Sequence, residues 1–100
     1  MTTVIHIRHA PRGWRENPRF VYIGRANRKN GLARSKWANP YHVYEHGRGG
    51  ACRRYREEFP KRTLLVRFLP ELVDKVLVCY CKPDTCHGDF LAEQANALAA

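Results

Sequence analysis

The residues best suited to chemistry lie close together near the carboxyl end of the chain, at positions 79–89. This segment reads Cys-Tyr-Cys-Lys-Pro-Asp-Thr-Cys-His-Gly-Asp. Thiols, an imidazole and a carboxylate at such short spacing could bind a metal ion, attack an electrophile or be oxidised. The segment is therefore the first candidate for a functional site.

A strand and a helix are expected to hold this segment between them. Residues 75–81 (KVLVCYC) form a near-continuous apolar run, which predicts a central strand that is buried on both faces. Strand alternation then places Cys79 and Cys81 on the same face. A last helix is predicted over residues 86–98, and its first turn meets the end of that strand. In open α/β sheets, ligands bind outside the carboxyl ends of the strands, which is where this junction falls.

The start of that helix favours anionic chemistry. A helix N-terminus stabilises a thiolate and lowers the pKa of a cysteine placed there. Cys86 is therefore the predicted nucleophile or redox thiol, with His87 or Asp89 as its acid–base partner.

Two other interpretations of the cysteines stay open. Cys79, Cys81, Cys86 and His87 could bind zinc, because three thiolates and one imidazole suit a structural site. Their spacing lacks the usual C-x2-C pair, and thiols two residues apart on a straight strand diverge. Alternatively, the cysteines are small core residues and Cys86 and His87 only cap a helix.

The remaining elements indicate a small single α/β domain over residues 1–100, with three or more strands. Strands are predicted over residues 3–8 and 20–23, and further helices over about 50–59 and 63–73. About eleven residues join the first two strands, whereas a parallel crossover between neighbours needs a dozen or more. This pair is therefore predicted to be antiparallel or joined by an unusually short crossover. If antiparallel, Arg8 and Arg25 would lie at opposite ends of the sheet.

The charge is strongly asymmetric along the chain. The net charge is +9, and residues 1–62 hold fifteen Lys and Arg against four Asp and Glu. Residues 63–100 hold three against five. Such an excess attracts phosphate-bearing partners, and charge alone does not separate a nucleotide from a nucleic acid.

Several separated motifs resemble one known family. The order Tyr22-Ile23-Gly24-Arg25, Lys36-Trp37-Ala38-Asn39-Pro40, Cys79-Tyr80-Cys81-Lys82-Pro83 and Cys86-His87-Gly88-Asp89 is similar to the family filed as domain of unknown function 4326. The family usually has Gly where this chain has Ala38, and Trp where it has Tyr80. The resemblance implies an α/β fold and an origin in a bacteriophage or a bacterium, and it names no activity.

The resemblance also marks candidate site residues. A phosphate-bearing ligand is expected to contact Gly24, Arg25, Lys36, Trp37 and Asn39, beside the catalytic candidates Cys86, His87 and Asp89. Each has a structural alternative, and Trp37 in particular suits a core position because of its large burial gain.

The function expected from these residues is the binding of a nucleotide or other phosphate-bearing ligand at a Cys/His pocket, and whether the protein is an enzyme stays open. The alternative is a non-enzymatic module that binds nucleic acid or a host protein, with a structural zinc site or a buried Cys cluster. No apolar run approaches the ~20 residues of a membrane span. The start of the chain lacks the apolar stretch of a signal peptide, so a cytoplasmic location without a membrane partner is expected.

Overall fold

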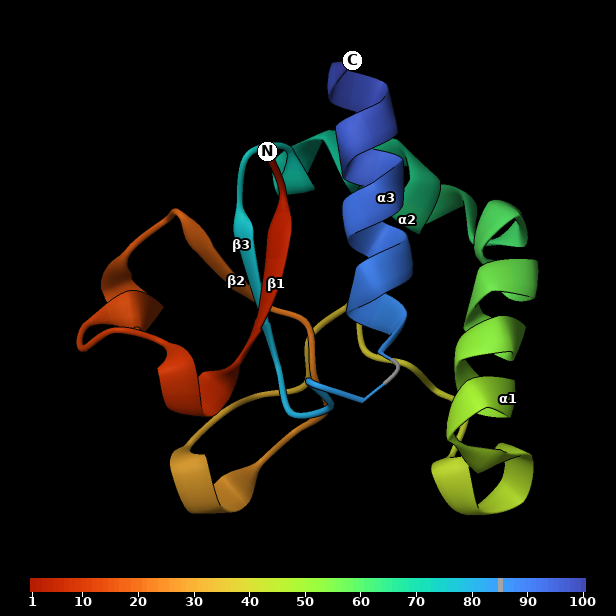
Figure 1. The fold of residues 1–100 in the computed structure, drawn as a ribbon, viewed down its shortest axis with the longest axis horizontal. Helices are drawn as coiled ribbons and strands as arrows, with labels where there is room; N and C mark the ends of the chain where they lie inside the picture. The colour runs from red at the N-terminus through yellow and green to blue at the C-terminus, as the bar shows by residue number, and fades with distance from the viewer. Residues whose placement is uncertain (85) are drawn as a thin grey trace.

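A three-stranded parallel sheet organises the molecule (Figure 1). The structure is a computed structural model and describes residues 1–84 and 86–100. Strands β1 (Thr3–His6), β2 (Phe20–Tyr22) and β3 (Val76–Cys79) lie in the order β1-β3-β2, so β3 is central. The α/β class predicted from the sequence is confirmed, and all three strands end at one edge of the sheet, which we call the carboxyl edge.

The central strand forms where the apolar run predicts it. Leu77 and Val78 are fully buried, and Leu77 pairs in register with Val4 of β1 and Val21 of β2. β3 ends at Cys79, two residues earlier than predicted, so Tyr80 and Cys81 lie beyond the paired part of the strand. Both residues therefore lie at the carboxyl edge, outside the strand pairing.

The prediction for the first two strands assumed that they are neighbours in the sheet, and this assumption is wrong. β1 and β2 do not pair with each other, because each pairs in parallel with β3. The connection over residues 7–19 therefore reaches the far edge of β3 and includes two short 3-10 turns. Because the strands are parallel, Arg8 and Arg25 follow strands that end at the same edge of the sheet.

Three helices lie on one side of the sheet, and the loop of residues 7–19 lies on the other (Figure 1). They are α1 (Val43–Glu58), α2 (Thr63–Phe68) and α3 (His87–Ala99). Helix α3 packs on β1 and β3 through fully buried Leu91 and Ala95. Within the described residues, none of the helices is both long and apolar enough to cross a membrane.

Two predicted helix boundaries need correction. The helix expected over about 50–59 begins at Val43, and a break at Gly47 (φ 70°, ψ 164°) divides it. Only glycine adopts that backbone conformation readily, so the chain can turn there and resume a helix. The helix expected over 63–73 ends at Phe68 and continues as the 3-10 turn Leu69–Leu72, which has Pro70 in its first turn.

Trp37 and Tyr55 anchor the core between the helices and the sheet. Trp37 is 2% exposed and Tyr55 is 1% exposed. The Tyr55 hydroxyl donates a hydrogen bond of 2.9 Å to the Trp37 carbonyl oxygen. This bond joins the loop before α1 to the helix itself, so the loop approaches the carboxyl edge in a fixed position.

Candidate functional site

A cavity of about 350 Å³ opens at the carboxyl edge, and we call it the main cavity. Its size falls in the range of small-molecule sites. Four chain segments form it: the end of β2 and the residues after it, the loop before α1 with the first turns of α1, the end of β3, and the start of α3. Its lining comprises Tyr22, Gly24, Arg25, Ala26, Asn27, Asn39, Tyr41, His42, Val43, Tyr44, Arg48, Ala51, Cys52, Cys79, Tyr80, Cys81 and His87.

Gly24 makes room for one aromatic wall of the cavity. A Cβ atom at this position would lie 2.4 Å from the Tyr22 hydroxyl oxygen, so only glycine accommodates the ring as it stands. The Tyr22 hydroxyl donates a hydrogen bond of 2.6 Å to the Arg25 carbonyl oxygen. Burial is the main cause that raises the pKa of Tyr22 to about 12, so this hydroxyl stays a donor at neutral pH.

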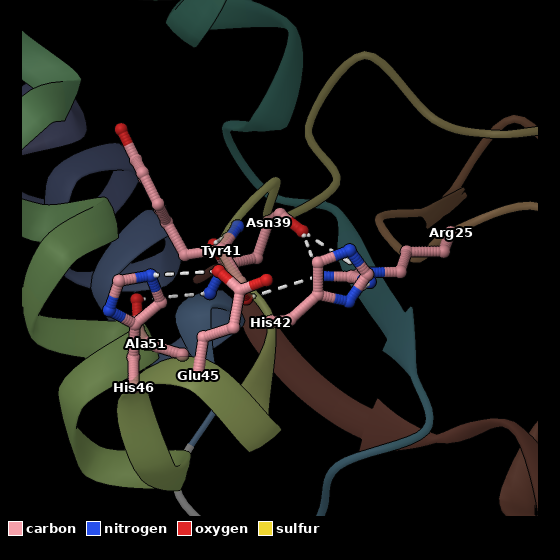
Figure 2. Close-up of polar contacts among 7 residues, drawn as sticks. All are labelled: Arg25, Asn39, Tyr41, His42, Glu45, His46 and Ala51. Carbon is pink, nitrogen blue, oxygen red and sulfur yellow. Dashed lines mark hydrogen bonds and ion pairs between the residues drawn. The ribbon is translucent and has the colours of Figure 1, made fainter.

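Arg25 holds the loop before α1 against the sheet (Figure 2). Its Nε and Nη2 atoms donate to the Asn39 carbonyl oxygen at 3.1 and 2.8 Å, and Nη2 also donates to the Tyr41 carbonyl oxygen at 3.1 Å. Nη1 lies 2.6 Å from Nδ1 of His42. A guanidinium has five N–H donors, so these contacts leave one for a ligand. The predicted phosphate-binding residue therefore lines the cavity while it positions the opposite wall.

Asn39 fixes the same loop to α1. Its side-chain Nδ2 atom donates to the Ala51 carbonyl oxygen at 3.1 Å, and its Oδ1 atom accepts from the backbone N–H of Tyr41 at 2.9 Å (Figure 2). The side chain thus lines the cavity as a brace between loop and helix.

Beyond this brace, the end of the loop and the first turn of α1 each present one ring to the cavity. The rings of His42 and Tyr44 stack with centroids 5.7 Å apart and planes within 5°. Tyr44 is 91% exposed, so its ring is open to a ligand.

The break at Gly47 directs the main part of α1 toward the cavity. Arg48, Ala51 and Cys52, which follow the break, all line it. The Arg48 guanidinium lies 3.7 Å from the Asp84 carboxylate, a long and exposed ion pair. Because such a pair contributes little, Arg48 is available to a stronger anion.

The three cysteines of the motif lie in one region, because Cys79 and Cys86 belong to the buried core and Cys81 packs against it. The pKa values of the three thiols are perturbed mainly by one another. The thiols of Cys81 and Cys86 donate to Cys79 and so lower its pKa, with help from the backbone N–H groups of Lys82 and Cys81. The same hydrogen bonds, with burial, raise the pKa of Cys86.

This distribution differs from the prediction that a helix N-terminus lowers the pKa of Cys86. Cys86 does cap α3, and its sulfur accepts from the Gly88 amide at 3.3 Å. Thiol donation to its neighbours, together with burial, outweighs the effect of the helix. Cys79 and Cys81 line the main cavity, whereas Cys86 faces a separate cavity of about 240 Å³ beside Asp89.

His87 is buried and turned toward the sheet. Its Nε2 atom lies 2.8 Å from the Ile23 carbonyl oxygen and so carries the proton, which leaves Nδ1 as an acceptor 3.9 Å from the sulfur of Cys86. Burial is the main cause that lowers the pKa of His87. Asp89 pairs with Lys82 at 2.7 Å, which raises the pKa of that lysine and ties residue 82 to α3.

The zinc interpretation gains no support from this arrangement. Across residues 1–84 and 86–100, no three His, Cys, Asp or Glu side chains are grouped so that they could hold a metal ion. The imidazole of His87 is engaged with the Ile23 carbonyl oxygen.

Two predicted ligand residues lie outside the main cavity. Lys36 pairs with Glu71 at 2.8 Å, and its ammonium lies 4.3 Å from the Phe68 ring centroid. It borders a second, open groove next to α2. Trp37 is a core residue, as its size favoured, and its ring is unavailable to a ligand.

Several lining residues carry no signal in the motifs. Tyr44, His42 and Arg48 come from the HVYEHGRGG stretch, which lies outside the motifs and contains the helix break at Gly47. Cys52 also lies outside the motifs, and it is half-buried and opens to the cavity. The stretch's density of His, Tyr, Arg and Gly was the signal that could have marked it.

Comparison with known proteins identifies a family and nothing closer. A family model described as a domain of unknown function, DUF4326, matches residues 5–97. No curated protein and no solved structure shows a significant match. The matched range includes β2, β3 and the last two residues of β1. It also includes every residue that lines the main cavity and the whole cysteine motif. The chain therefore belongs to the DUF4326 family.

Proposed function

We propose that the protein binds a nucleotide, or a closely similar phosphate-bearing molecule, in the main cavity. The observation that carries this proposal is the composition of the cavity, in which two arginines face a set of aromatic rings at the carboxyl edge of a parallel sheet. Open α/β sheets bind ligands at this edge. A nucleotide has the matching division into an anionic end and a flat aromatic end.

The phosphate is assigned to Arg48 and Arg25. Among the described residues, the 3.7 Å contact with Asp84 is the one ion pair of Arg48, and Arg25 forms none with a carboxylate. Guanidinium groups bind phosphate oxygens through paired N–H donors. Arg25 supplies its positive charge and one N–H, while Arg48 is free to reorient toward the ligand.

The base is assigned to the aromatic wall. Tyr44 and His42 form a stacked pair at the cavity, and the rings of Tyr22 and Tyr80 meet edge to face with centroids 6.3 Å apart. A base that stacks on the exposed Tyr44 ring would remove that apolar surface from water. The aromatic contribution explains why the lining is largely apolar despite its two arginines.

The thiols add a chemical option at the floor of the cavity. Cys52, Cys79 and Cys81 line it, so they are the sulfurs that a bound ligand could approach. The catalytic assignment to Cys86, His87 and Asp89 stays a prediction. In this arrangement His87 lines the cavity itself, whereas Cys86 would act on the ligand through Cys79 and Cys81, and Asp89 through Lys82.

The proposal is tested by isothermal titration calorimetry of the purified protein with AMP, GMP, CMP and UMP, each compared with its nucleoside and with inorganic phosphate. At least one monophosphate should bind at least tenfold more tightly than its nucleoside and than phosphate alone. Arg48→Gln should weaken the monophosphate and leave the nucleoside unchanged. Tyr44→Ala should weaken both.

A matched control is Arg67→Gln, which removes an exposed arginine on α2 that lies outside the cavity. This variant has the same net charge as Arg48→Gln and should bind as the unchanged protein does. Absence of binding by all four monophosphates at millimolar concentration, or equal losses in the Arg48 and Arg67 variants, would overturn the proposal.

A further inference from the structure

Beside the main cavity, the carboxyl edge carries a row of aromatic rings. The ring of Tyr80 meets His6 edge to face at 5.8 Å and Tyr22 at 6.3 Å, and Tyr22 lies 6.4 Å from Trp14. These rings come from the ends of all three strands and from the loop of residues 7–19. None of the four is fully buried, and Tyr80 is 38% exposed. We call this row the aromatic ledge.

Two basic loops, residues 7–19 and 24–34, follow β1 and β2 along the chain (Figure 1). Residues 7–19 and 24–34 together hold a single acidic residue, Glu16, and these eight basic ones: Arg8, Arg12, Arg15, Arg19, Arg25, Arg28, Lys29 and Arg34. In the part of the chain that the structure describes, none of the eight forms an ion pair with a carboxylate. Arg19 directly precedes β2, at the opposite edge of the sheet, and Arg34 borders the groove next to α2. The other six basic residues are the candidates for contacts beside the ledge.

Direct contacts hold the loops and the ledge together. Asn30 donates a hydrogen bond of 2.7 Å to the Tyr80 hydroxyl, and Arg15 donates to the Asn30 carbonyl oxygen. The Arg15 guanidinium also lies 5.7 Å from the Trp14 ring centroid. The ledge is also continuous with the main cavity, because Tyr22 and Tyr80 line both.

From this arrangement we infer that the protein binds single-stranded nucleic acid along the aromatic ledge, with one nucleotide of the strand in the main cavity. This inference rests on the proposed function and extends it from a nucleotide to a nucleotide within a strand. Rings that stack on bases, flanked by cations that follow the phosphates, are the general means of binding single strands. Charge alone would suit any polyanion, but the four adjoining rings favour one with unpaired bases.

The binding test uses fluorescence anisotropy with a labelled eight-nucleotide oligothymidylate, and a hairpin duplex of the same charge for comparison. The single strand should bind at least tenfold more tightly than the duplex. The logarithm of its affinity should fall linearly with the logarithm of the salt concentration, by roughly 0.7 for each phosphate contact.

Two variants separate charge from stacking. Arg28→Gln/Lys29→Gln should weaken oligothymidylate binding about tenfold and reduce the salt slope by roughly 1.4, which corresponds to two lost phosphate contacts. Arg53→Gln/Arg67→Gln removes two exposed arginines of α1 and α2 that form no ion pair within the described residues, and it should change neither quantity. Tyr80→Ala should weaken binding at least fivefold, and Tyr80→Phe, which retains the ring but loses the contact with Asn30, should weaken it less than Tyr80→Ala does.

The outcomes distinguish this inference from the proposed function. If Arg28→Gln/Lys29→Gln weakens oligothymidylate binding and leaves AMP binding unchanged, the result supports both the inference and the proposed function. If AMP binds but oligothymidylate does not, the proposed function stands and the inference fails. If oligothymidylate binds but no monophosphate does, the cavity assignment fails. Equal binding of heparin and oligothymidylate, unaffected by Tyr80→Ala, would show a surface for polyanions in general and overturn the inference, as would equal losses in the two double variants.

Discussion

Replacing Gly88 by alanine tests how the cysteine motif is attached to the sheet. A Cβ atom at position 88 would lie 2.6 Å from Cδ1 of Ile23 and 3.0 Å from Cγ1 of Val4. Ile23 is fully buried, and its carbonyl oxygen holds the imidazole of His87. The first turn of α3 therefore approaches the sheet so closely that it leaves no space for a methyl group.

The size of the effect follows from two opposing contributions. Forcing a methyl group into a well-packed core destabilises by about 1–3 kcal/mol. Alanine is a better helix former than glycine by about 1 kcal/mol, which offsets part of that loss. The net expectation is a decrease of about 0–2 kcal/mol in the free energy of unfolding. For a domain of this size, each kcal/mol lowers the melting temperature by about 4–8 °C.

A double-mutant cycle measured by urea unfolding provides the decisive comparison. Ile23→Val removes Cδ1, the atom in closest conflict, and should destabilise the protein by about 0.5–1.5 kcal/mol on its own. Combined with Gly88→Ala, it relieves the 2.6 Å contact and leaves only the 3.0 Å contact with Val4. The double variant should therefore be about 1 kcal/mol more stable than the sum of the single effects. Additive effects in this cycle would refute the close approach.

Three further predictions concern stability and reactivity. Tyr55→Phe leaves the buried Trp37 carbonyl without its 2.9 Å hydrogen bond and should lower the free energy of unfolding by about 1–3 kcal/mol in urea; an unchanged value would contradict this role. Burial lowers the pKa of His87 below the usual 6.5, so unfolding takes up a proton, and stability should be full above pH 6.5 and fall as the pH drops below it. Urea unfolding at pH 7.5 and 5.5 should show this decrease, and His87→Gln should reduce it; an equal decrease in both proteins would assign it to other groups. Iodoacetamide, followed by mass spectrometry, should modify half-buried Cys52 and Cys81 before buried Cys79 and Cys86, and urea should abolish the difference; early modification of Cys86 would contradict its burial.

The sequence is a good guide to the fold where one pattern dominates. The apolar run before the cysteines predicts the central strand, because a strand covered on both faces needs continuous apolar residues. The order of the strands in the sheet could not be predicted from the sequence in the same way. Counting residues between β1 and β2 assumed that strands adjacent in the chain pair with each other, whereas β3, from far along the chain, lies between them. Local spacing contains no information about such an insertion.

The site was predictable in location and less so in its residues. Placing the motif at a strand end led directly to the main cavity, because that edge is set by chain direction alone. Lys36 was wrongly grouped with Arg25, since the turn after Ser35 carries its side chain toward Glu71 and Phe68 instead. Tyr44 and Arg48 were missed because their positions depend on a helix break at Gly47, which requires the tertiary structure to be recognised.

The motif residues form the framework of the cavity more than its contact surface. Gly24 admits the ring of Tyr22, Arg25 and Asn39 hold the loop before α1, and Gly88 allows α3 to meet the sheet. Each of these contacts fixes the position of another residue, and each requires the residue type found there. A ligand would then be bound chiefly by side chains outside the motifs, such as Tyr44 and Arg48. It follows that substitutions in the framework should disturb folding and binding together, whereas substitutions of Tyr44 or Arg48 should change binding while stability is preserved.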